Sequence, residues 1–450
     1  MSVDLSAKKA TSIQLFNFSM PAMRAFHMSW FAFFVCFFAW FACAPLMPVL
    51  AGEFHLTKDQ IANINIAAVA ITILVRLVVG PLCDKYGPRI TYTSLLLIGS
   101  LPVFGVALAN SYESFLFFRL LIGAIGASFV ITQYHTSIMF ASNVVGTANA
   151  TSAGWGNAGG GAAQALIPLL LSALLMFGVE QTLGWRVALL VPGVLMVVVG
   201  ALYWLLTQDC PQGNFKQLRT QGHTISSDKK GGIAVLMHAA RNYRVWILFT
   251  SYAACFGIEI FIHNIIAVYY VEHFQFDLKT AGLSAGIFGL LALFARALGG
   301  IVSDKIALKK GLDGRTQILF LLILAEGVFL ALFSQMHSAV AAILVMTLFA
   351  LFTHMACGAT YALVPFIDRD ALGGVAGIIG AGGNVGAVAA GFLLKGMLDI
   401  QSCLMILGGC VVLAAISVLL IRFSTEHKAK EQCLFEQALI ERQSEQQHIA

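Results

Sequence analysis

Residues 76–85 read RLVVGPLCDK, and residues 296–305 read RALGGIVSDK. Arginine, glycine, aspartate and lysine recur at the same spacing in the two stretches, which begin 220 positions apart. A second pair, GWGNAGG at 154–160 and GAGGNVG at 380–386, places two asparagines 227 positions apart. Two repeats at nearly the same separation predict that the chain folds as two related halves.

The composition predicts a membrane protein. Of the 450 residues, 59% are hydrophobic and 11% are charged, whereas a soluble globular protein carries about 25% charged residues. Such a chain cannot cover its surface with polar groups, which excludes soluble enzymes, nucleic-acid binders and secreted disulfide scaffolds. We expect an all-α integral membrane protein with twelve transmembrane helices in two pseudo-symmetric six-helix halves, each helix about 20 residues long.

Hydropathy divides the chain into an N-terminal half (1–207), a polar central loop (208–243), a C-terminal half (244–421) and a polar tail (422–450). The predicted spans cover approximately 27–50, 61–82, 90–109, 115–140, 144–175, 185–207, 244–270, 281–302, 317–334, 339–366, 371–394 and 402–421. With the N-terminus inside, 20 of the 27 lysines and arginines lie on the cytoplasmic side. The distribution therefore predicts a multi-pass cell-membrane protein with both termini in the cytoplasm.

Two arginines inside apolar spans are the strongest functional signal. Arg76 lies in span two and Arg296 at the equivalent position in span eight, and neither span contains a carboxylate. A guanidinium in the bilayer costs a few kcal/mol even on lenient scales. Two of them at repeat-related positions predict an anion held between the halves, and their planar forks suit a planar oxyanion. The alternative is that each arginine pairs with a carboxylate on another span.

Span seven carries a stripe of side chains that could serve the same site. At 100° per residue, Tyr252, Phe256, Glu259 and His263 fall on one helical face. Glu259 could exchange a proton with the outside, or it could pair with an arginine, which would remove it from a proton route. Both alternatives remain open at the level of sequence.

The glycine-rich runs of spans five and eleven have two possible explanations. Small residues allow helices to pack backbone to backbone, or they allow the backbone to approach a small substrate. Asn157 and Asn384 within these runs could accordingly bind the substrate or fix a helix contact. The nine cysteines are scattered and form no CxxC pair, so we expect neither a metal site nor a cofactor.

The loop after span two resembles the cytoplasmic loop signature of the major facilitator superfamily. The resemblance implies a gating role for this loop and for its counterpart in the second half, at Gly80, Asp84, Gly87 and Arg89 and at Gly300 and Asp304. The stretches 26–30, 153–161, 251–257 and 380–387 are similar to the nitrate–nitrite porter family of that superfamily.

The resemblance to this family implies a substrate and a site. Arg76 and Arg296 would hold nitrate, Tyr252 would hydrogen-bond it, and Phe129 and Phe256 would lie against its two faces. Asn157 and Asn384 would lie near the substrate in the helices that move.

The resemblance also implies an activity. We expect a secondary active transporter, not an enzyme, that imports nitrate, with nitrite as a further candidate, by alternating access and proton-coupled symport. Nitrate/nitrite exchange is the alternative mechanism, and a non-transporting nitrate sensor is the alternative of another class. The expected partners are nitrate or nitrite, protons and the lipid bilayer, with no nucleic acid and with the monomer as the functional unit.

Overall fold

The computed structural model describes residues 9–140, 144–221, 237–368, 372–396 and 399–429. Within these ranges twelve helices are long and apolar enough to cross a membrane, which confirms the predicted number. No strand is assigned in the described ranges. The elements are α1 (Pro21–Phe41), η1 (Ala44–Leu46), α2 (Met47–Glu53), α3 (Lys58–Tyr86), α4 (Pro88–Val106), α5 (Tyr112–Ile122), η2 (Gly123–Ala127), α6 (Ser128–Met139), α7 (Val145–Met176), α8 (Gln181–Leu206), α9 (Phe215–Thr220), α11 (Tyr243–Tyr252), η4 (Ala253–Gly257), α12 (Ile258–Phe274), α13 (Leu278–Leu290), α14 (Ala292–Phe333), α15 (Ala339–Leu363), η5 (Val364–Phe366), α16 (Leu372–Gly396) and α17 (Ile400–Val418).

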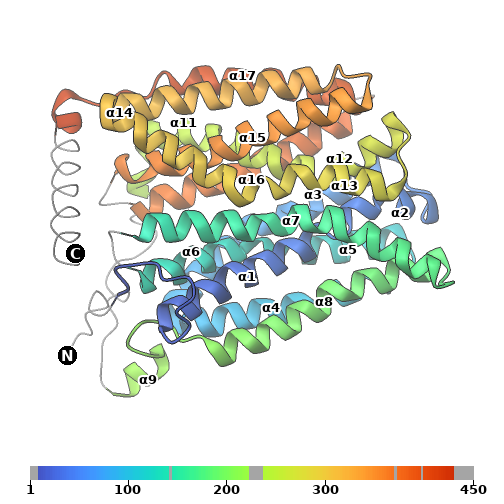
Figure 1. The fold of residues 1–450 in the computed structure, drawn as a ribbon, viewed down its shortest axis with the longest axis horizontal. Coiled ribbons are helices and arrows are strands. Elements are labelled where there is room, and N and C mark those ends of the chain that lie inside the picture. The colour runs from blue at the N-terminus through green and yellow to red at the C-terminus, as the bar shows by residue number, and fades with distance from the viewer. Residues whose placement is uncertain (1–8, 141–143, 222–236, 369–371, 397–398, 430–450) are drawn as a thin grey trace.

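The helices form two bundles that lie side by side (Figure 1). Helices α1 to α8 make the lower bundle in this view, and α11 to α17 make the upper one. Short α9 marks the left-hand end of the molecule and α2 the right-hand end, so we refer below to the α9 end and the α2 end. The two bundles correspond to the two halves that the internal repeat predicted.

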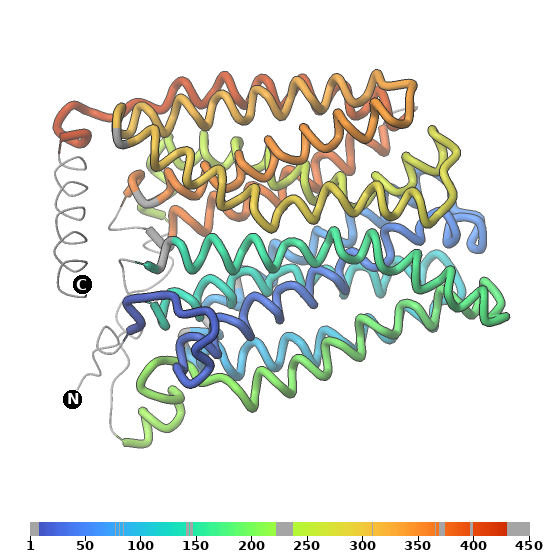
Figure 2. Tube along the Cα trace, viewed as in Figure 1, coloured from blue at the N-terminus to red at the C-terminus, as the bar shows by residue number. Residues whose placement is uncertain are grey.

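The contact between the halves has the symmetry of the repeat. Helix α3 of the first half packs against α16 of the second, and α7 packs against α13 and α14, as the boundary between the bundles in Figure 2 illustrates. The two arginine-bearing helices, α3 and α14, therefore each face a glycine- and asparagine-rich helix of the opposite half. This arrangement brings both repeat signatures to the interface.

Glycines permit this packing because a side chain would collide with the neighbouring backbone. A Cβ atom at Gly161 would lie 2.4 Å from the amide nitrogen of Leu290, and one at Gly154 would lie 2.9 Å from the carbonyl oxygen of Ala292. Within the second half, a Cβ atom at Gly382 of α16 would lie 2.4 Å from the carbonyl oxygen of Phe249 in α11. The first of the two explanations, close helix packing, accounts for these glycines.

The polar segment 303–316 between the predicted spans eight and nine is mostly helical. Helix α14 continues from Ala292 to Phe333 and contains one residue with non-helical backbone angles, Gly311, at φ 57° and ψ −143°. Glycine tolerates a positive φ without a Cβ penalty, so the chain reverses there while its flanks stay helical. Spans eight and nine are therefore separated by a short turn at Gly311, and most of the polar segment belongs to the helix ends on either side of it.

Candidate functional site

Arg76 lies at the boundary between the halves and contacts both of them. Its guanidinium donates to the carbonyl oxygen of Gly126 in η2 at 3.2 Å and to that of Gly380 in α16 at 3.4 Å. Its Nε atom is buried without a hydrogen-bond partner. Among the described residues no carboxylate forms an ion pair with Arg76, so its positive charge is balanced only by carbonyl dipoles.

The glycine-rich run of span four explains one of these contacts. Residues 123–127 form a 3₁₀ turn between α5 and α6, and such turns have poorer hydrogen-bond geometry than an α-helix. A side chain at Gly123 would lie 2.5 Å from the carbonyl oxygen of Ala68 in α3. The turn thus sits directly against α3, where the Gly126 carbonyl can reach Arg76.

Aromatic rings surround the two guanidinium groups. The Cζ atom of Arg76 lies 5.7 Å from the centre of the Phe129 ring and 5.9 Å from that of Phe256, and the Cζ atom of Arg296 lies 5.3 Å from Phe256. Tyr252 stacks on Phe256 with ring centres 5.1 Å apart. Rings at these distances attract cations through their π faces, and the structure brings all five residues together.

Arg296 differs from Arg76 because it has a carboxylate partner. Its Nη2 atom lies 2.5 Å from Oε2 of Glu259, with the two side chains 6% and 1% exposed. The alternative in which a carboxylate from another span neutralises the arginine is therefore correct for Arg296 but not for Arg76. The expectation that neither arginine has an acidic neighbour is corrected at Arg296.

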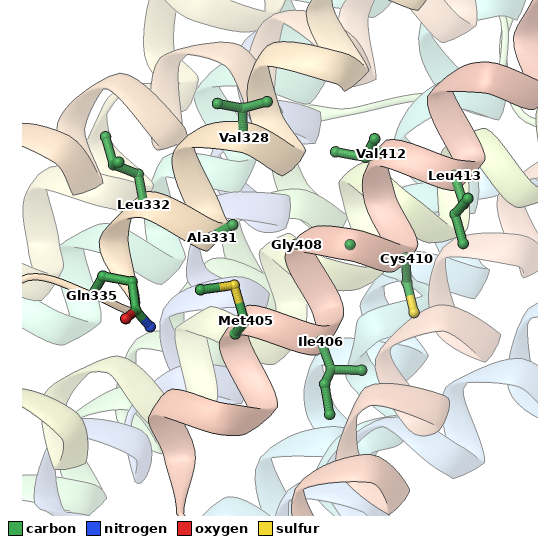
Figure 3. Close-up of a pocket in the computed structure, with 11 residues that line it drawn as sticks. Val328, Ala331, Leu332, Gln335, Met405, Ile406, Gly408, Cys410, Val412 and Leu413 are labelled. Atoms are coloured by element: carbon green, nitrogen blue, oxygen red, sulfur yellow. The ribbon is translucent and has the colours of Figure 1, made fainter.

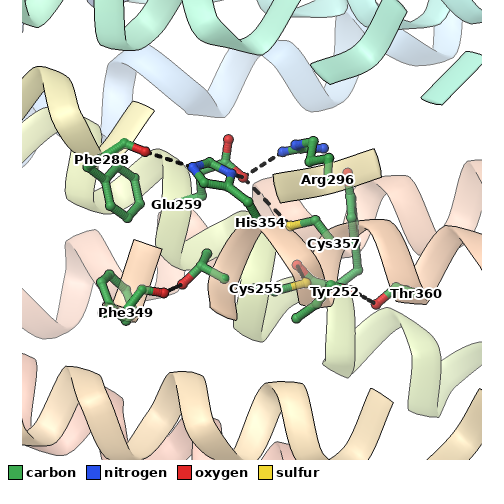
Figure 4. Close-up of polar contacts among 11 residues, drawn as sticks. Tyr252, Cys255, Glu259, Phe288, Arg296, Phe349, His354, Cys357 and Thr360 are labelled. Carbon is green, nitrogen blue, oxygen red and sulfur yellow. Dashed lines mark hydrogen bonds and ion pairs between the residues drawn. The ribbon is translucent and has the colours of Figure 1, made fainter. Parts of the chain in front are cut away.

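Two residues of α15 complete a cluster on the same carboxylate oxygen. Nδ1 of His354 lies 3.5 Å from Oε2 of Glu259, and Sγ of Cys357 donates to it at 3.6 Å. Figure 4 shows the Glu259 carboxylate between Arg296 and His354, with the other side of the imidazole turned to the carbonyl of Phe288. Nε2 of His354 lies 2.9 Å from that carbonyl oxygen.

Close helix packing positions this cluster. A Cβ atom at Gly358 would lie 2.0 Å from the carbonyl oxygen of Arg296, and one at Gly299 would lie 2.0 Å from that of Met355. Helices α14 and α15 therefore touch backbone to backbone at the level of Arg296. This approach places His354 and Cys357 beside the Arg296–Glu259 pair.

The paired asparagines are buried amides without partners. Asn157 is 1% exposed and Asn384 is 0% exposed, and neither the Oδ1 nor the Nδ2 atom of either residue has a hydrogen-bond partner among the described residues. Asn384 lies one helical turn beyond Gly380, whose carbonyl accepts from Arg76. Unpaired buried amides cost free energy, so these groups are available to a polar ligand.

The residues with an expected gating role lie at the α9 end in different settings. Gly87, at φ 91°, leaves room for Asp209, which accepts from the amide nitrogen of Arg89 at 2.9 Å. Asp304 pairs with Arg315 at 2.6 Å. Gly80 and Gly300 face open space, and the side chain of Asp84 lies outside the described part of the structure.

Sequence reasoning missed three residues of the site. The ring of Tyr361 lies 5.0 Å from that of Tyr252 and 6.3 Å from that of Phe129, and His354 and Cys357 contact Glu259. All three lie on α15, which carries no repeat signature. The approach of His354 to Glu259 depends on the packing of α15 against α14, which no sequence pattern shows.

A separate hollow on the molecule has a different character. It lies between α14 and α17 and is lined mainly by apolar side chains, among them Val328, Leu332, Met405 and Leu413 (Figure 3). Gln335 also lines it, but it contains no charged group. We therefore assign the candidate site to the arginine pair and not to this hollow.

Comparison with known proteins identifies the family. The family model of the Major Facilitator Superfamily matches residues 29–367. The protein named High affinity nitrate transporter 2.5 of Arabidopsis thaliana is 40% identical over 380 residues, which are 84% of this chain and 75% of that protein. Nitrate/nitrite transporter NrtP of Nostoc punctiforme is 27% identical over 441 residues, covering 83% of this chain and 87% of that one.

Solved structures agree on the fold. A bacterial homologue of the human lysosomal transporter Spinster, in an inward-facing and unoccupied conformation, matches with a TM-score of 0.65 at 15% identity, covering 90% of this chain and 99% of that one. The nucleoside transporter NupG matches with a TM-score of 0.63 at 12% identity, covering 88% and 99%. With its twelve helices, its paired signatures and these relatives, the chain belongs to the nitrate–nitrite porter family of the major facilitator superfamily.

Proposed function

We propose that this protein imports nitrate, with nitrite as a second substrate, by alternating access of one site between the two halves. The observation that carries the proposal is the half-buried Arg76 guanidinium, which contacts both halves and has no carboxylate partner among the described residues. A monovalent anion beside it would neutralise the site and offset the desolvation of the charge. The curated relatives include proteins named as nitrate transporters.

The shape of the site favours a small flat anion. Phe129 and Phe256 flank the Arg76 guanidinium, so a planar ion that meets the guanidinium fork edge-on would lie between ring faces. Tyr252, Asn157 and Asn384 add hydroxyl and amide donors that could hydrogen-bond its oxygens. A bulky organic anion would have to displace these rings.

The proposed orientation places the α9 end in the cytoplasm of a cell membrane, with the monomer as the functional unit. The lysine- and arginine-rich connections lie at that end, as the positive-inside rule requires. Moving a −1 ion inward against 100 mV costs about 2.3 kcal/mol. Accumulation therefore needs either entering protons or a departing anion, and we propose proton-coupled symport.

Nitrate/nitrite exchange is the second candidate, and the ion pair between Arg296 and Glu259 supports it. A carboxylate held by an arginine at 2.5 Å is a poor site for a travelling proton. Exchange would need only the two arginines and a bound anion in each direction. Symport requires a proton gradient, whereas exchange does not.

Reconstituted proteoliposomes can separate these mechanisms. Vesicles without internal anion substrate, given an inward proton gradient, should accumulate nitrate if the protein is a symporter. Vesicles loaded with nitrite, without any gradient, should take up nitrate rapidly if it is an exchanger. The proposal of transport fails if neither condition gives uptake while purified protein binds nitrate, which is the result expected of a sensor.

The same assay applied to Glu259→Gln tests the acidic partner. If Glu259 belongs to the proton route, the variant should lose the pH dependence of uptake. Unchanged pH dependence would assign Glu259 to structure alone and would favour exchange.

A further inference from the structure

We propose that His354 is the proton-binding site of coupled transport, and that a proton on its Nδ1 atom draws Glu259 away from Arg296 so that Arg296 can bind the anion. This inference rests on the proposed nitrate transport and deepens it by naming where the proton is held. It begins with the hydrogen bonds of a single imidazole ring.

The backbone determines which nitrogen of His354 carries hydrogen in the neutral ring. Nε2 lies 2.9 Å from the carbonyl oxygen of Phe288, and a carbonyl oxygen can only accept, so Nε2 must be the donor. Phe288 lies in the last turn of α13, where helix carbonyls lack intrahelical partners. The neutral ring is therefore held with hydrogen on Nε2 and a lone pair on Nδ1.

That lone pair faces a carboxylate oxygen. Nδ1 of His354 lies 3.5 Å from Oε2 of Glu259 and has no hydrogen-bond partner. Two acceptors facing each other in a buried place repel, whereas a proton on Nδ1 converts the contact into an ion pair. A proton would therefore be stabilised in the gap between Nδ1 of His354 and Oε2 of Glu259.

The surroundings leave few competitors for that proton. Three groups contact or pair within the cluster around Oε2 of Glu259: Glu259 itself on α12, Arg296 on α14 and Cys357 on α15. His263 lies one turn further along α12. Cys255, Tyr252 and the buried Glu326 are also nearby. Protonation of Glu259 would break its pair with Arg296. His354 can accept a proton while that pair is still in place.

Protonation of His354 changes what Arg296 can do. Arg296, His354 and Cys357 all converge on the same Oε2 atom. When His354 is neutral, Arg296 is the only cation of the three, and the carboxylate of Glu259 cancels its charge. When His354 is a cation, the carboxylate is shared between two cations, and the Arg296 guanidinium regains positive potential toward the interface between the halves.

Proton and anion therefore bind with positive coupling, which is reciprocal. Arg76, Arg296 and Glu259 together carry one net positive charge, which a nitrate ion cancels. A proton on His354 adds a second positive charge that strengthens anion binding, and the bound anion in turn favours the proton. Coupling of ordinary size in proteins changes affinity about 5- to 150-fold.

Nitrate binding to the purified full-length protein tests this coupling directly. Calorimetry across pH 5.5 to 8 should show nitrate affinity rising at least about tenfold toward acid, within the usual range of coupling. In His354→Gln, whose amide can still donate to the Phe288 carbonyl, the affinity should vary less than about twofold over the same interval. His263→Gln, a buried histidine one turn from Glu259, is the matched control and should keep the wild-type dependence.

A second measurement needs no variant. Wild-type protein titrated with nitrate in two buffers of different ionisation enthalpy reports the number of protons taken up with each anion. We expect uptake of up to one proton with each anion. No proton uptake at any pH overturns the proposal, even if His354→Gln fails to fold.

Flux measurements separate this inference from the proposed function. In proteoliposomes, His354→Gln should lose nitrate accumulation driven by a proton gradient, while nitrate–nitrate exchange falls by no more than a few-fold. Loss of both activities in folded protein, or retention of proton-driven accumulation, overturns the role of His354 but leaves nitrate transport intact. Absence of any nitrate flux in the wild type would instead contradict the proposed function itself.

Discussion

Arg76 and Arg296 have the same place in the repeat but different electrostatic surroundings. Arg296 is paired with Glu259, and Arg76 rests on two carbonyl oxygens and two phenylalanine rings. A charge without a counter-ion in an apolar interior is unfavourable unless a ligand supplies the opposite charge. Under the proposed function, this asymmetry would make Arg76 the primary anion-binding group and Arg296 the group whose availability is regulated.

Replacement of Arg76 by lysine tests the paired donors of the guanidinium group rather than its charge. Arg76→Lys keeps the positive charge but cannot reach the carbonyls of Gly126 and Gly380 together, and it loses the planar face toward the rings. We expect nitrate affinity to fall by about 10- to 100-fold, the equivalent of about 1.4 to 3 kcal/mol. Calorimetry on purified protein measures this loss.

An arginine outside the site provides the control for that change. Arg24 is exposed and donates to the carbonyls of Phe18 and Ser19, so Arg24→Lys should leave nitrate affinity unchanged. Near-native affinity in Arg76→Lys would show that bidentate geometry at this position is not needed for binding.

Sequence alone could locate some residues of the site and not others. Arg76 and Arg296 stand out because a charge inside an apolar span is rare, and Tyr252, Phe256 and Glu259 follow from helical periodicity. Whether Glu259 pairs with an arginine could not be decided from sequence, because a contact between α12 and α14 depends on how far apart the two helices pack. The same reason hid His354 and Tyr361.

At the scale of elements, prediction from sequence is limited by the assumption that every span is a regular α-helix. Hydropathy locates all twelve spans, but span seven contains a π-helical turn at residues 253–257 and span four a 3₁₀ turn at 123–127. Both turns lie at the level of the arginines. Their geometry depends on close contact with α16 and α3, which no local pattern encodes.

The contact between α16 and the π-helical turn can be tested with two glycines on one helix. A Cβ atom at Gly386 would lie 2.4 Å from the carbonyl oxygen of Ala253, whereas one at Gly377 would meet no atom within 4 Å. Gly386→Ala should destabilise the protein by about 1 to 3 kcal/mol through overpacking and should reduce nitrate binding. Thermal unfolding in detergent and nitrate calorimetry check both effects.

Gly377→Ala serves as the matched control because it adds the same methyl group to the same helix. It should leave stability and nitrate binding at the wild-type level. Equal effects from the two substitutions would show that α16 is sensitive to helix propensity rather than to its contact with the π-helical turn.

The connection at the α9 end predicts a pH effect outside the membrane. Burial raises the pKa of the Asp209 carboxyl above its usual value, although the amides of Phe215 and Arg89 partly oppose the shift. The folded protein then holds the proton to higher pH than the unfolded chain does. The contribution of Asp209 to stability is therefore largest below its unfolded pKa, about 3.9, and declines as the pH rises through the folded pKa.

Asp209→Asn removes this titration while keeping a side chain of similar size. As the pH rises from 3.5 to 7, the melting temperature of the wild type should fall relative to that of the variant. Melting curves in detergent at intervals of half a pH unit would measure it. A difference that stays constant over this range would show that Asp209 titrates alike in the folded and unfolded protein.

At the scale of the whole molecule, polar contacts join the halves from the level of Arg76 toward the α2 end. The buried guanidinium of Arg119 in α5 donates to Oδ1 of Asn264 in α12 at 3.2 Å and to the carbonyl of Trp40 at 2.8 Å. Nearer the α2 end, Lys395 donates to Asn63 at 3.1 Å. Alternating access requires these contacts to break when the α2 end opens.

The buried Arg119–Asn264 contact should hold the halves together more strongly than the exposed Lys395–Asn63 contact. Asn264→Ala leaves a buried guanidinium donor without its acceptor in the closed arrangement, at a cost of about 1 to 3 kcal/mol. Loss of the exposed Lys395–Asn63 contact in Lys395→Ala should cost no more than about 1 kcal/mol. Since about 1.4 kcal/mol is a factor of ten, the population open at the α2 end should rise by about 5- to 150-fold in Asn264→Ala and by no more than about fivefold in Lys395→Ala.

Spin labels at Gly52→Cys and Gly396→Cys would report this opening, because both positions are exposed. Gly52 lies in α2 of the first half, and Gly396 ends α16 of the second half, next to Lys395, which contacts Asn63 near the start of α3. The exposed Cys410 and the Cys433 of the polar tail would both be replaced by serine to keep labelling specific. We expect a longer-distance population to grow in Asn264→Ala and to shrink again when nitrate is added, if the anion favours the closed arrangement seen here. A larger shift in Lys395→Ala than in Asn264→Ala would mean that the surface contact, and not the buried Arg119–Asn264 bridge, controls closure, because only the contact that carries more free energy can dominate the equilibrium between the two arrangements.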